Sequence, residues 1–257
     1  MADFIDADLR GSRFTRVDLT GAEFRRARLN GITVRGAGLH GVRLDGVELV
    51  DAQITGEVEN LTINGVEVSA YVNAELDRRD PDRVAMRPTD AEGFRAAWAL
   101  LERLWEGTLE RARALEPDAL HVSVDEEWSF VETLRHLLFV TDSWVRRGIL
   151  RVEDPWDPWD LPWDEMPDTP GIPRDRTVRP DLDDVLVRRR ERQALVRGFL
   201  AQLTDARLDE HTEPLDGDSW PPARPFAVRE CLEVLLLEEW HHRLYAERDL
   251  TALGAPT

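Results

Sequence analysis

The chain has 257 residues and a formal net charge of −18, and 42% of its residues are hydrophobic. A chain of this length and composition can bury a sizeable core, in one large or two smaller domains. Its negative charge disfavours binding to nucleic acids or anionic membranes, because both need clustered basic residues.

The cysteine content and the hydropathy pattern indicate the compartment. Cys231 is the single cysteine, so no disulfide can form within the chain, and a reducing environment is expected. No apolar run of about 18 residues is present, which predicts no transmembrane helix. The N-terminal sequence MADFIDADLR lacks the apolar segment of a signal peptide. We therefore expect a cytoplasmic protein with no membrane partner.

Residues 1–70 follow a repeat of five residues. Every fifth residue from Phe4 to Ile54 is large and apolar, and a small or β-branched residue stands two positions before each. A period of five matches neither a helix (about 3.6) nor a strand (about 2). Glycine, which tolerates turn conformations, recurs at positions 11, 21, 31, 36, 41, 46 and 56.

The segments ADLRG, VDLTG and AEFRR resemble the pentapeptide-repeat family. The resemblance implies a right-handed quadrilateral β-solenoid with the large residues stacked inside. We therefore expect a multi-domain protein with a β part and an all-α part: a short β-solenoid in residues 1–70, a charged linker in 71–88 and a helical domain in 89–257. The solenoid is expected to dock a protein partner or a second copy of the chain. Mimicry of DNA is disfavoured because this region is short and nearly neutral.

Residues 89–257 predict an antiparallel four-helix bundle. Thr89 with Glu92, and Ser129 with Glu132, fit the S/T-x-x-E capping box that begins many helices. Apolar residues at helical spacing predict helices over residues 89–115, 129–150, 181–203 and 226–250.

The segment 151–180, between the second and third predicted helices, holds seven Pro and three Trp. Loops of this length are usually functional or disordered, and Trp156, Trp159 and Trp163 argue against disorder. Two interpretations stay open. The segment is either a hydrophobic flap packed on the bundle or a lid or wall of a ligand pocket.

The last predicted helix carries polar residues in the sequence LEEWHHR. Cys231, Leu235, Glu238, His242 and Tyr245 follow one another in steps of four and three residues, so they share one helix face. The apolar residues before Glu238 predict that this face points inward, which stacks Glu238 and His242 one turn apart. Glu239 falls on a different face and is expected to be solvated.

A buried carboxylate needs a partner. Glu238 and His242 could both bind one divalent cation, with His136 of the second helix as third ligand. Two alternatives stay open: His136 is a hydrogen-bonded core histidine, and Glu238 pairs with a buried arginine, for which Arg189 qualifies. Arg189 is also a weak candidate to bind a cofactor or substrate carboxylate.

The sequences EWSFVETLRHLLFVTDSW and LLLEEWHHR resemble the DinB superfamily over residues 85–250. The resemblance implies a four-helix bundle that holds zinc or nickel with a histidine of helix two and an (H/E)-x-x-x-H pair of helix four. On this sequence these ligands are His136, Glu238 and His242, with Arg243 following the last ligand. The carboxylate resembles the branch of the mycothiol-dependent maleylpyruvate isomerases.

These features predict a metal- and thiol-dependent transferase or isomerase. It would join small electrophiles to a low-molecular-weight thiol such as mycothiol, a chemistry typical of detoxification. Three ligands leave open positions, as a catalytic metal requires, and no catalytic side chain is identifiable. The alternative is a non-catalytic interaction module with a structural or vestigial metal site.

Overall fold

The computed structural model describes residues 3–215, 217 and 219–256. Contacts within the chain divide it into two compact units, one up to Gly56 and one from Glu57 onward. We refer to them as the N-terminal and C-terminal units.

The backbone of the N-terminal unit turns every five residues. Each fifth residue from Asp6 to Gly56 has a positive φ, and most of them are glycines, in which this conformation is not strained. Non-glycine residues occupy the same conformation at Asp6, Arg16, Arg26 and Asp51. The predicted turns at the repeated glycines are therefore confirmed.

The β-solenoid itself is not confirmed. No residue from Asp3 to Gly56 lies in a strand, and all of them are exposed. Phe14 and Phe24, predicted to stack inside, are 58% and 64% exposed. The physical reason is that a turn is a local property, whereas a solenoid interior needs several stacked coils and a cap at each end. Fewer than three coils supply few stacked neighbours.

The C-terminal unit begins with a hairpin and two short helices. Strands β1 (Thr62–Ile63) and β2 (Val66–Glu67) pair antiparallel around Asn64 and Gly65, both with positive φ, as a tight hairpin turn requires. Helices α1 (Ser69–Arg79) and α2 (Asp82–Ala85) follow. The segment 71–88, expected as a charged linker, is thus largely helical.

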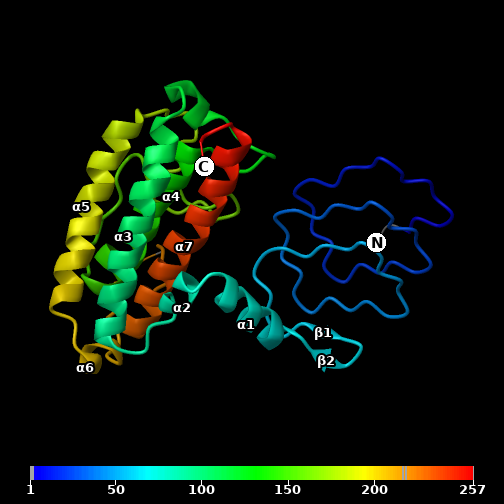
Figure 1. Cartoon of the computed structure of the whole chain (residues 1–257), viewed down its shortest axis with the longest axis horizontal. Helices are drawn as coiled ribbons and strands as arrows, with labels where there is room; N and C mark the ends of the chain where they lie inside the picture. Colours follow the sequence, from blue (N-terminus) through cyan, green and yellow to red (C-terminus); the bar gives the residue numbers. More distant parts are fainter. Residues whose placement is uncertain (1–2, 216, 218, 257) are drawn as a thin grey trace. The chain divides into compact units, whose positions relative to one another are not determined.

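In the described part of the chain, four long helical segments form the bundle, and Figure 1 shows how they are arranged. They are α3 (Ala91–Arg113), α4 (Phe130–Thr141) with its π-helical continuation η2 (Asp142–Ile149), α5 (Leu182–Ala201) and α7 (Val228–Ala252). Helix α3 packs on α5 and α7, and α4 packs on the same two helices, which closes the ring. Shorter elements are the 3-10 helix η1 (Pro117–His121) and α6 (Asp205–Leu208). The helical domain is thus confirmed.

Capping residues fix where the bundle helices begin. The capping box of Ser129 and Glu132 is present at the start of α4, with the Glu132 carboxylate 2.9 Å from the Ser129 backbone nitrogen. The box predicted at Thr89 is wrong. Asp90 is the N-cap of α3, and its carboxylate accepts a hydrogen bond from the Gly93 backbone. A carboxylate one position closer to the helix satisfies the same free backbone donors.

None of the helices that the structure describes is both long enough and apolar enough to span a membrane.

Candidate metal centre

The structure brings His136, Glu238 and His242 together. Each offers one ligand atom, and these atoms lie within 4.8 Å of one another. His136 comes from α4, and the other two come from the neighbouring helix α7, one turn apart. Side-chain exposure is 6% for His136, 17% for His242 and 34% for Glu238, so the cluster is closed on the histidine side and open at the carboxylate.

The ring of His136 is oriented by a backbone contact. Its Nδ1 lies 2.9 Å from the carbonyl oxygen of Leu161, in the segment between η2 and α5. A carbonyl only accepts, so Nδ1 carries the proton and donates it. Burial lowers the pKa of His136, which favours the neutral ring. In that ring Nε2 carries a lone pair, which is the form that binds metals.

Glu238 lies between the two imidazoles. One of its oxygens is 3.4 Å from Nε2 of His136 and 3.2 Å from Nδ1 of His242. Burial alone would raise the pKa of Glu238, but the contacts with both histidines hold it below its usual value. The carboxylate of Glu238 is therefore ionised and faces two imidazole nitrogens. A donor set of two imidazoles and a carboxylate fits a divalent metal.

Aromatic side chains surround the cluster. The ring of Trp128 lies 4.6 Å from that of His136 and 5.9 Å from that of His242, measured between centroids. The ring of Phe139 lies 6.0 Å from that of His136, and the ring of Tyr245 lies 5.9 Å from that of His242. The sequence reasoning missed Trp128, although its position directly before the Ser129 cap could have pointed to it.

The burial of Glu238 and Glu239 differs from the prediction. Glu239, expected to be solvated, is only 2% exposed, and its carboxylate accepts two hydrogen bonds from Arg189, at 2.9 and 3.1 Å. The buried residues of α7 at this level are Leu235, Leu236, Glu239 and Trp240. Glu239 can be buried there because Arg189 pairs with its carboxylate.

Arg189 is buried and engaged within the chain. It is 4% exposed, and its guanidinium also lies 5.2 Å from the ring of Trp105. The buried arginine partner considered for Glu238 belongs to Glu239 instead. A role of Arg189 toward a cofactor stays a prediction. His241, the other histidine of the pair, lies outside the cluster and contacts Glu57 at 2.9 Å.

The segment 151–180 packs onto the bundle. Arg135, fully buried on α4, donates hydrogen bonds to the carbonyl oxygens of Trp159, Asp175 and Val178, at 2.8, 2.6 and 3.0 Å. Trp156 and Trp163 pack against the hydrophobic core. Leu161 of the same segment also contacts His136. The interpretation of the segment as a flap packed on the bundle is confirmed, and its role as a lid or wall of a ligand pocket stays a prediction.

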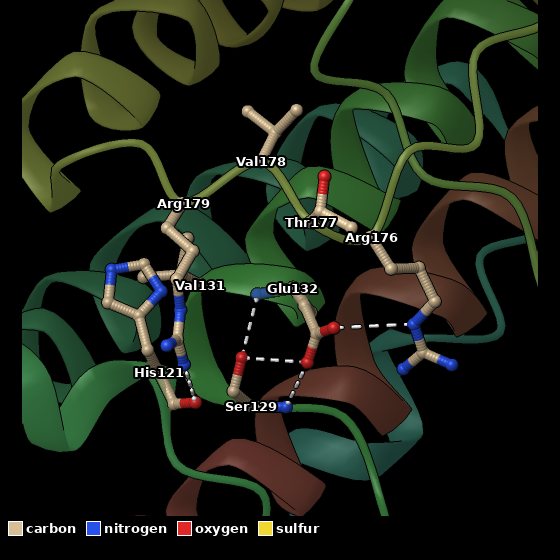
Figure 2. A pocket seen from close by; sticks show the side chains of 8 residues that line it. All are labelled: His121, Ser129, Val131, Glu132, Arg176, Thr177, Val178 and Arg179. Carbon is tan, nitrogen blue, oxygen red and sulfur yellow. Dashed lines mark hydrogen bonds and ion pairs between the residues drawn. The ribbon is translucent and has the colours of Figure 1, made fainter.

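A cavity of about 260 Å³ lies beside the N-terminus of α4. It is lined by His121, by Ser129, Val131 and Glu132, and by the segment 176–179. Figure 2 shows Arg176 on one side of Ser129 and Glu132, and Arg179 with His121 on the other. The sequence reasoning did not foresee this cavity.

Models of two known families match this chain, one in its N-terminal and one in its C-terminal part. A model of the DinB superfamily matches residues 100–246, and a model of pentapeptide repeats matches residues 2–36 in eight copies. The chain belongs to the DinB superfamily. Neither the curated proteins nor the solved structures contain a significant match. The DinB superfamily includes metal-dependent enzymes, and the matched range contains all three residues of the cluster.

Proposed function

We propose that this DinB-superfamily protein is a metal-dependent transferase or isomerase that uses a low-molecular-weight thiol to react with small electrophiles. His136, Glu238 and His242 would hold the metal, zinc or nickel. The observation that carries the proposal is the convergence of His136, Glu238 and His242, whose ligand atoms lie within 4.8 Å of one another inside the bundle. The superfamily match supports it, because members of the superfamily often bind metals.

Three protein ligands leave coordination positions open, as a catalytic metal needs. A divalent metal, when bound, lowers the pKa of a coordinated thiol, so that it reacts as a thiolate near neutral pH. Mycothiol is the thiol that we propose first, because the carboxylate at Glu238 resembles the branch that uses it.

The side chains around the cluster would shape the reaction site. Leu161 fixes the ring of His136, so that its Nε2 faces Glu238. The rings of Trp128 and Phe139 lie against that of His136 and would exclude water from the histidine side. The partly exposed Glu238 marks the side from which thiol and electrophile would approach.

Metal analysis of the purified, untagged protein and of His242→Ala tests the metal site. We expect a near-stoichiometric divalent metal in the natural protein and loss of it in the variant. His241→Ala is the matched control and should keep the metal, because His241 contacts Glu57 and not the cluster.

Thiol-dependent turnover then tests the reaction. Mycothiol, bacillithiol and glutathione are each combined with a panel of electrophiles such as monochlorobimane and 1-chloro-2,4-dinitrobenzene. We expect turnover that needs both the thiol and the metal. Turnover that persists in metal-free protein would contradict the proposal, as would a fully loaded protein that is inactive with every pair.

A second candidate function is a non-catalytic interaction module, and one observation favours it. The apolar residues of the pentapeptide repeats are exposed, including Phe4, Phe14 and Phe24. Exposed apolar surface of this extent often marks a binding site for another protein or for a second copy of the chain. Light scattering on the full chain and on a Phe14→Ser/Phe24→Ser variant tests it. An assembly that dissociates in the variant supports self-association, and a monomer in both cases contradicts it.

A further inference from the structure

Another cavity, of about 420 Å³, lies where the end of η2 meets the start of the proline-rich segment. It is lined by Arg147 of η2, by residues that directly follow this helix, and by Pro170, Leu215 and Ser219. Arg147 lies roughly 15 Å from His136 along the same helical segment. None of the three candidate metal ligands lines this cavity, so its chemistry is separate from that of the metal centre.

Arg147 is a buried cation without a carboxylate partner among the described residues. It is 8% exposed, its Nε donates to the hydroxyl of Ser219 at 3.0 Å, and its Nη1 donates to the carbonyl oxygen of Glu153. Its Nη2 has no described partner, and this atom is reached by solvent. In Arg135, by contrast, all three nitrogens donate to carbonyl oxygens. Because a buried charge is costly without an opposite charge, Nη2 of Arg147 is suited to hold an anionic group in the cavity.

The hydroxyl of Ser219 supplies a second donor beside Arg147. Its oxygen accepts the hydrogen bond from Nε, so its own proton is still available, and the described residues offer that proton no acceptor. A guanidinium nitrogen and a neighbouring hydroxyl can donate to the two oxygens of one carboxylate. The ring of Trp156 lies 5.4 Å from the guanidinium and gives the same region an apolar wall.

The cavity also contains unmatched negative charge. Glu153 and Asp154 line it, and both are exposed and have no ion-pair partner in the described part of the chain. The remaining charged residue, Arg151, pairs with Glu213. A simple anion would be attracted by Arg147 and repelled by the two carboxylates, and a simple cation would meet the opposite pattern. A molecule that carries both charges matches the lining at both ends.

We propose that this cavity binds a zwitterionic α-amino acid with an apolar side chain. Its carboxylate would accept hydrogen bonds from Arg147 and Ser219, and its ammonium group would donate to Glu153 and Asp154. The apolar side chain would pack against the ring of Trp156. At about 420 Å³, the cavity falls within the ~300–1,000 Å³ of typical small-molecule pockets and has room for one amino acid.

Calorimetry of the full-length protein with three matched ligands tests this charge pattern. L-phenylalanine carries both charges, 3-phenylpropanoate lacks the ammonium group, and 2-phenylethylamine lacks the carboxylate. We expect L-phenylalanine to bind at least about tenfold more tightly than either analogue, because each analogue leaves one part of the lining unmatched. Its affinity should be the same in His242→Ala, so the outcome does not depend on the proposed metal site.

Two variants separate the two ends of the cavity. Arg147→Gln should weaken the binding of L-phenylalanine at least about tenfold. Glu153→Gln/Asp154→Asn should weaken it by a similar factor but strengthen the binding of 3-phenylpropanoate, because the repulsion of its carboxylate is removed. The matched control is Glu165→Gln/Asp168→Asn, which removes the same charge from the same segment, at exposed residues that do not line the cavity. It should leave the affinities for all three ligands unchanged.

Three results would overturn the proposal. They are no binding of L-phenylalanine by the folded protein, equal binding of L-phenylalanine and either analogue, or equal affinities in the variant at Glu153 and Asp154 and in its control. Circular dichroism checks the folding of each variant before binding is measured. If Arg147→Gln does not fold, the variant at Glu153 and Asp154 still decides, because both of its changes lie at exposed residues.

Discussion

The Nδ1 atom of His136 lies 2.9 Å from the carbonyl oxygen of Leu161, which joins α4 of the bundle to the proline-rich segment that follows η2. The backbone nitrogen of Leu161 in turn lies 3.4 Å from the carbonyl oxygen of Arg135. The candidate metal centre therefore depends on a segment that contributes none of its three side chains. Contacts of this kind fix the tautomer and orientation of a ligating histidine.

Releasing this segment should disturb both stability and the site. Arg135→Lys replaces a guanidinium group that donates to three carbonyl oxygens with a single ammonium group. The ammonium group cannot donate to all three oxygens from one position. We expect a loss of about 2–4 kcal/mol in the free energy of unfolding, since buried carbonyls lose their donors. Trypsin should also cleave faster within residues 151–180.

Urea unfolding and limited proteolysis followed by mass spectrometry measure the two effects. Arg197→Lys on α5 is the control, because its partner Glu102 lies on α3 and its side chain is 54% exposed. Unchanged proteolysis of Arg135→Lys would show that the arginine does not hold the segment.

The buried pair of Glu239 and Arg189 predicts a large effect from a small change. Glu239→Gln leaves the Arg189 charge without a carboxylate in a site that is nearly inaccessible to water. Breaking such a pair costs about 3–5 kcal/mol, whereas the double variant Arg189→Met/Glu239→Leu should be close to neutral. Glu238→Gln in metal-free protein should cost less than about 1 kcal/mol, because that side chain is partly exposed. Chemical denaturation of all three variants gives the comparison, and similar losses for Gln at 238 and 239 would contradict it.

Asp160 predicts a pH dependence of stability. Asp160 is fully buried, and neither of its carboxylate oxygens has a hydrogen-bond partner among the described residues. Burial, together with the nearby charge of Asp142, raises the pKa of Asp160 well above its ordinary value. The charge of Arg192 opposes that rise, while the charge of Asp157 adds to it. The folded protein thus holds a proton that the unfolded chain releases.

The pKa of Asp160 is higher in the folded state than in the unfolded chain. Its contribution to the free energy of unfolding is therefore present at low pH and is lost as the pH rises through the folded-state pKa. Each pH unit between the unfolded and folded pKa values lowers the free energy of unfolding by about 1.4 kcal/mol. Asp160→Asn removes this slope, so the variant should be more stable than the natural protein at pH 8, and the difference should shrink toward pH 4. Thermal unfolding between pH 4 and 8 checks this. Exposed Asp154→Asn serves as control, and parallel curves for Asp160→Asn and the natural protein would contradict the prediction.

Trp128 is predicted to hold the imidazoles in place for the metal. Trp128→Ala removes a ring that contacts both His136 and His242 and admits water, so metal affinity should fall about tenfold. Trp128→Phe retains an aromatic wall and should lose less. Competition with a chelator measures the dissociation constants. Trp144→Ala, eight residues beyond His136 and about 12 Å along the same helical segment, should lower stability without changing metal affinity. Equal affinities for Trp128→Ala and the natural protein would exclude this role.

Local rules were enough to predict several features from the sequence. The five-residue period placed the turns of the N-terminal unit, because a positive φ is a preference of single residues. The Ser129 and Glu132 box placed the start of α4, since capping involves atoms only three residues apart. The spacing of Glu238 and His242 put both on one side of α7 by helix geometry alone.

What the sequence could not decide depends on contacts between distant segments. The same period of five predicted a stacked solenoid interior, but stacking is a long-range property, and these apolar residues are exposed. Which of Glu238 and Glu239 is buried was decided by Arg189, about 50 residues away on α5. Packing of distant segments likewise fixed the orientation of His136 and the contact of Trp128 with both histidines. The cavity beside α4 also forms only where such segments meet. Side chains whose environment comes from another element take their role from the tertiary structure, because burial and hydrogen-bond partners decide their charge and direction.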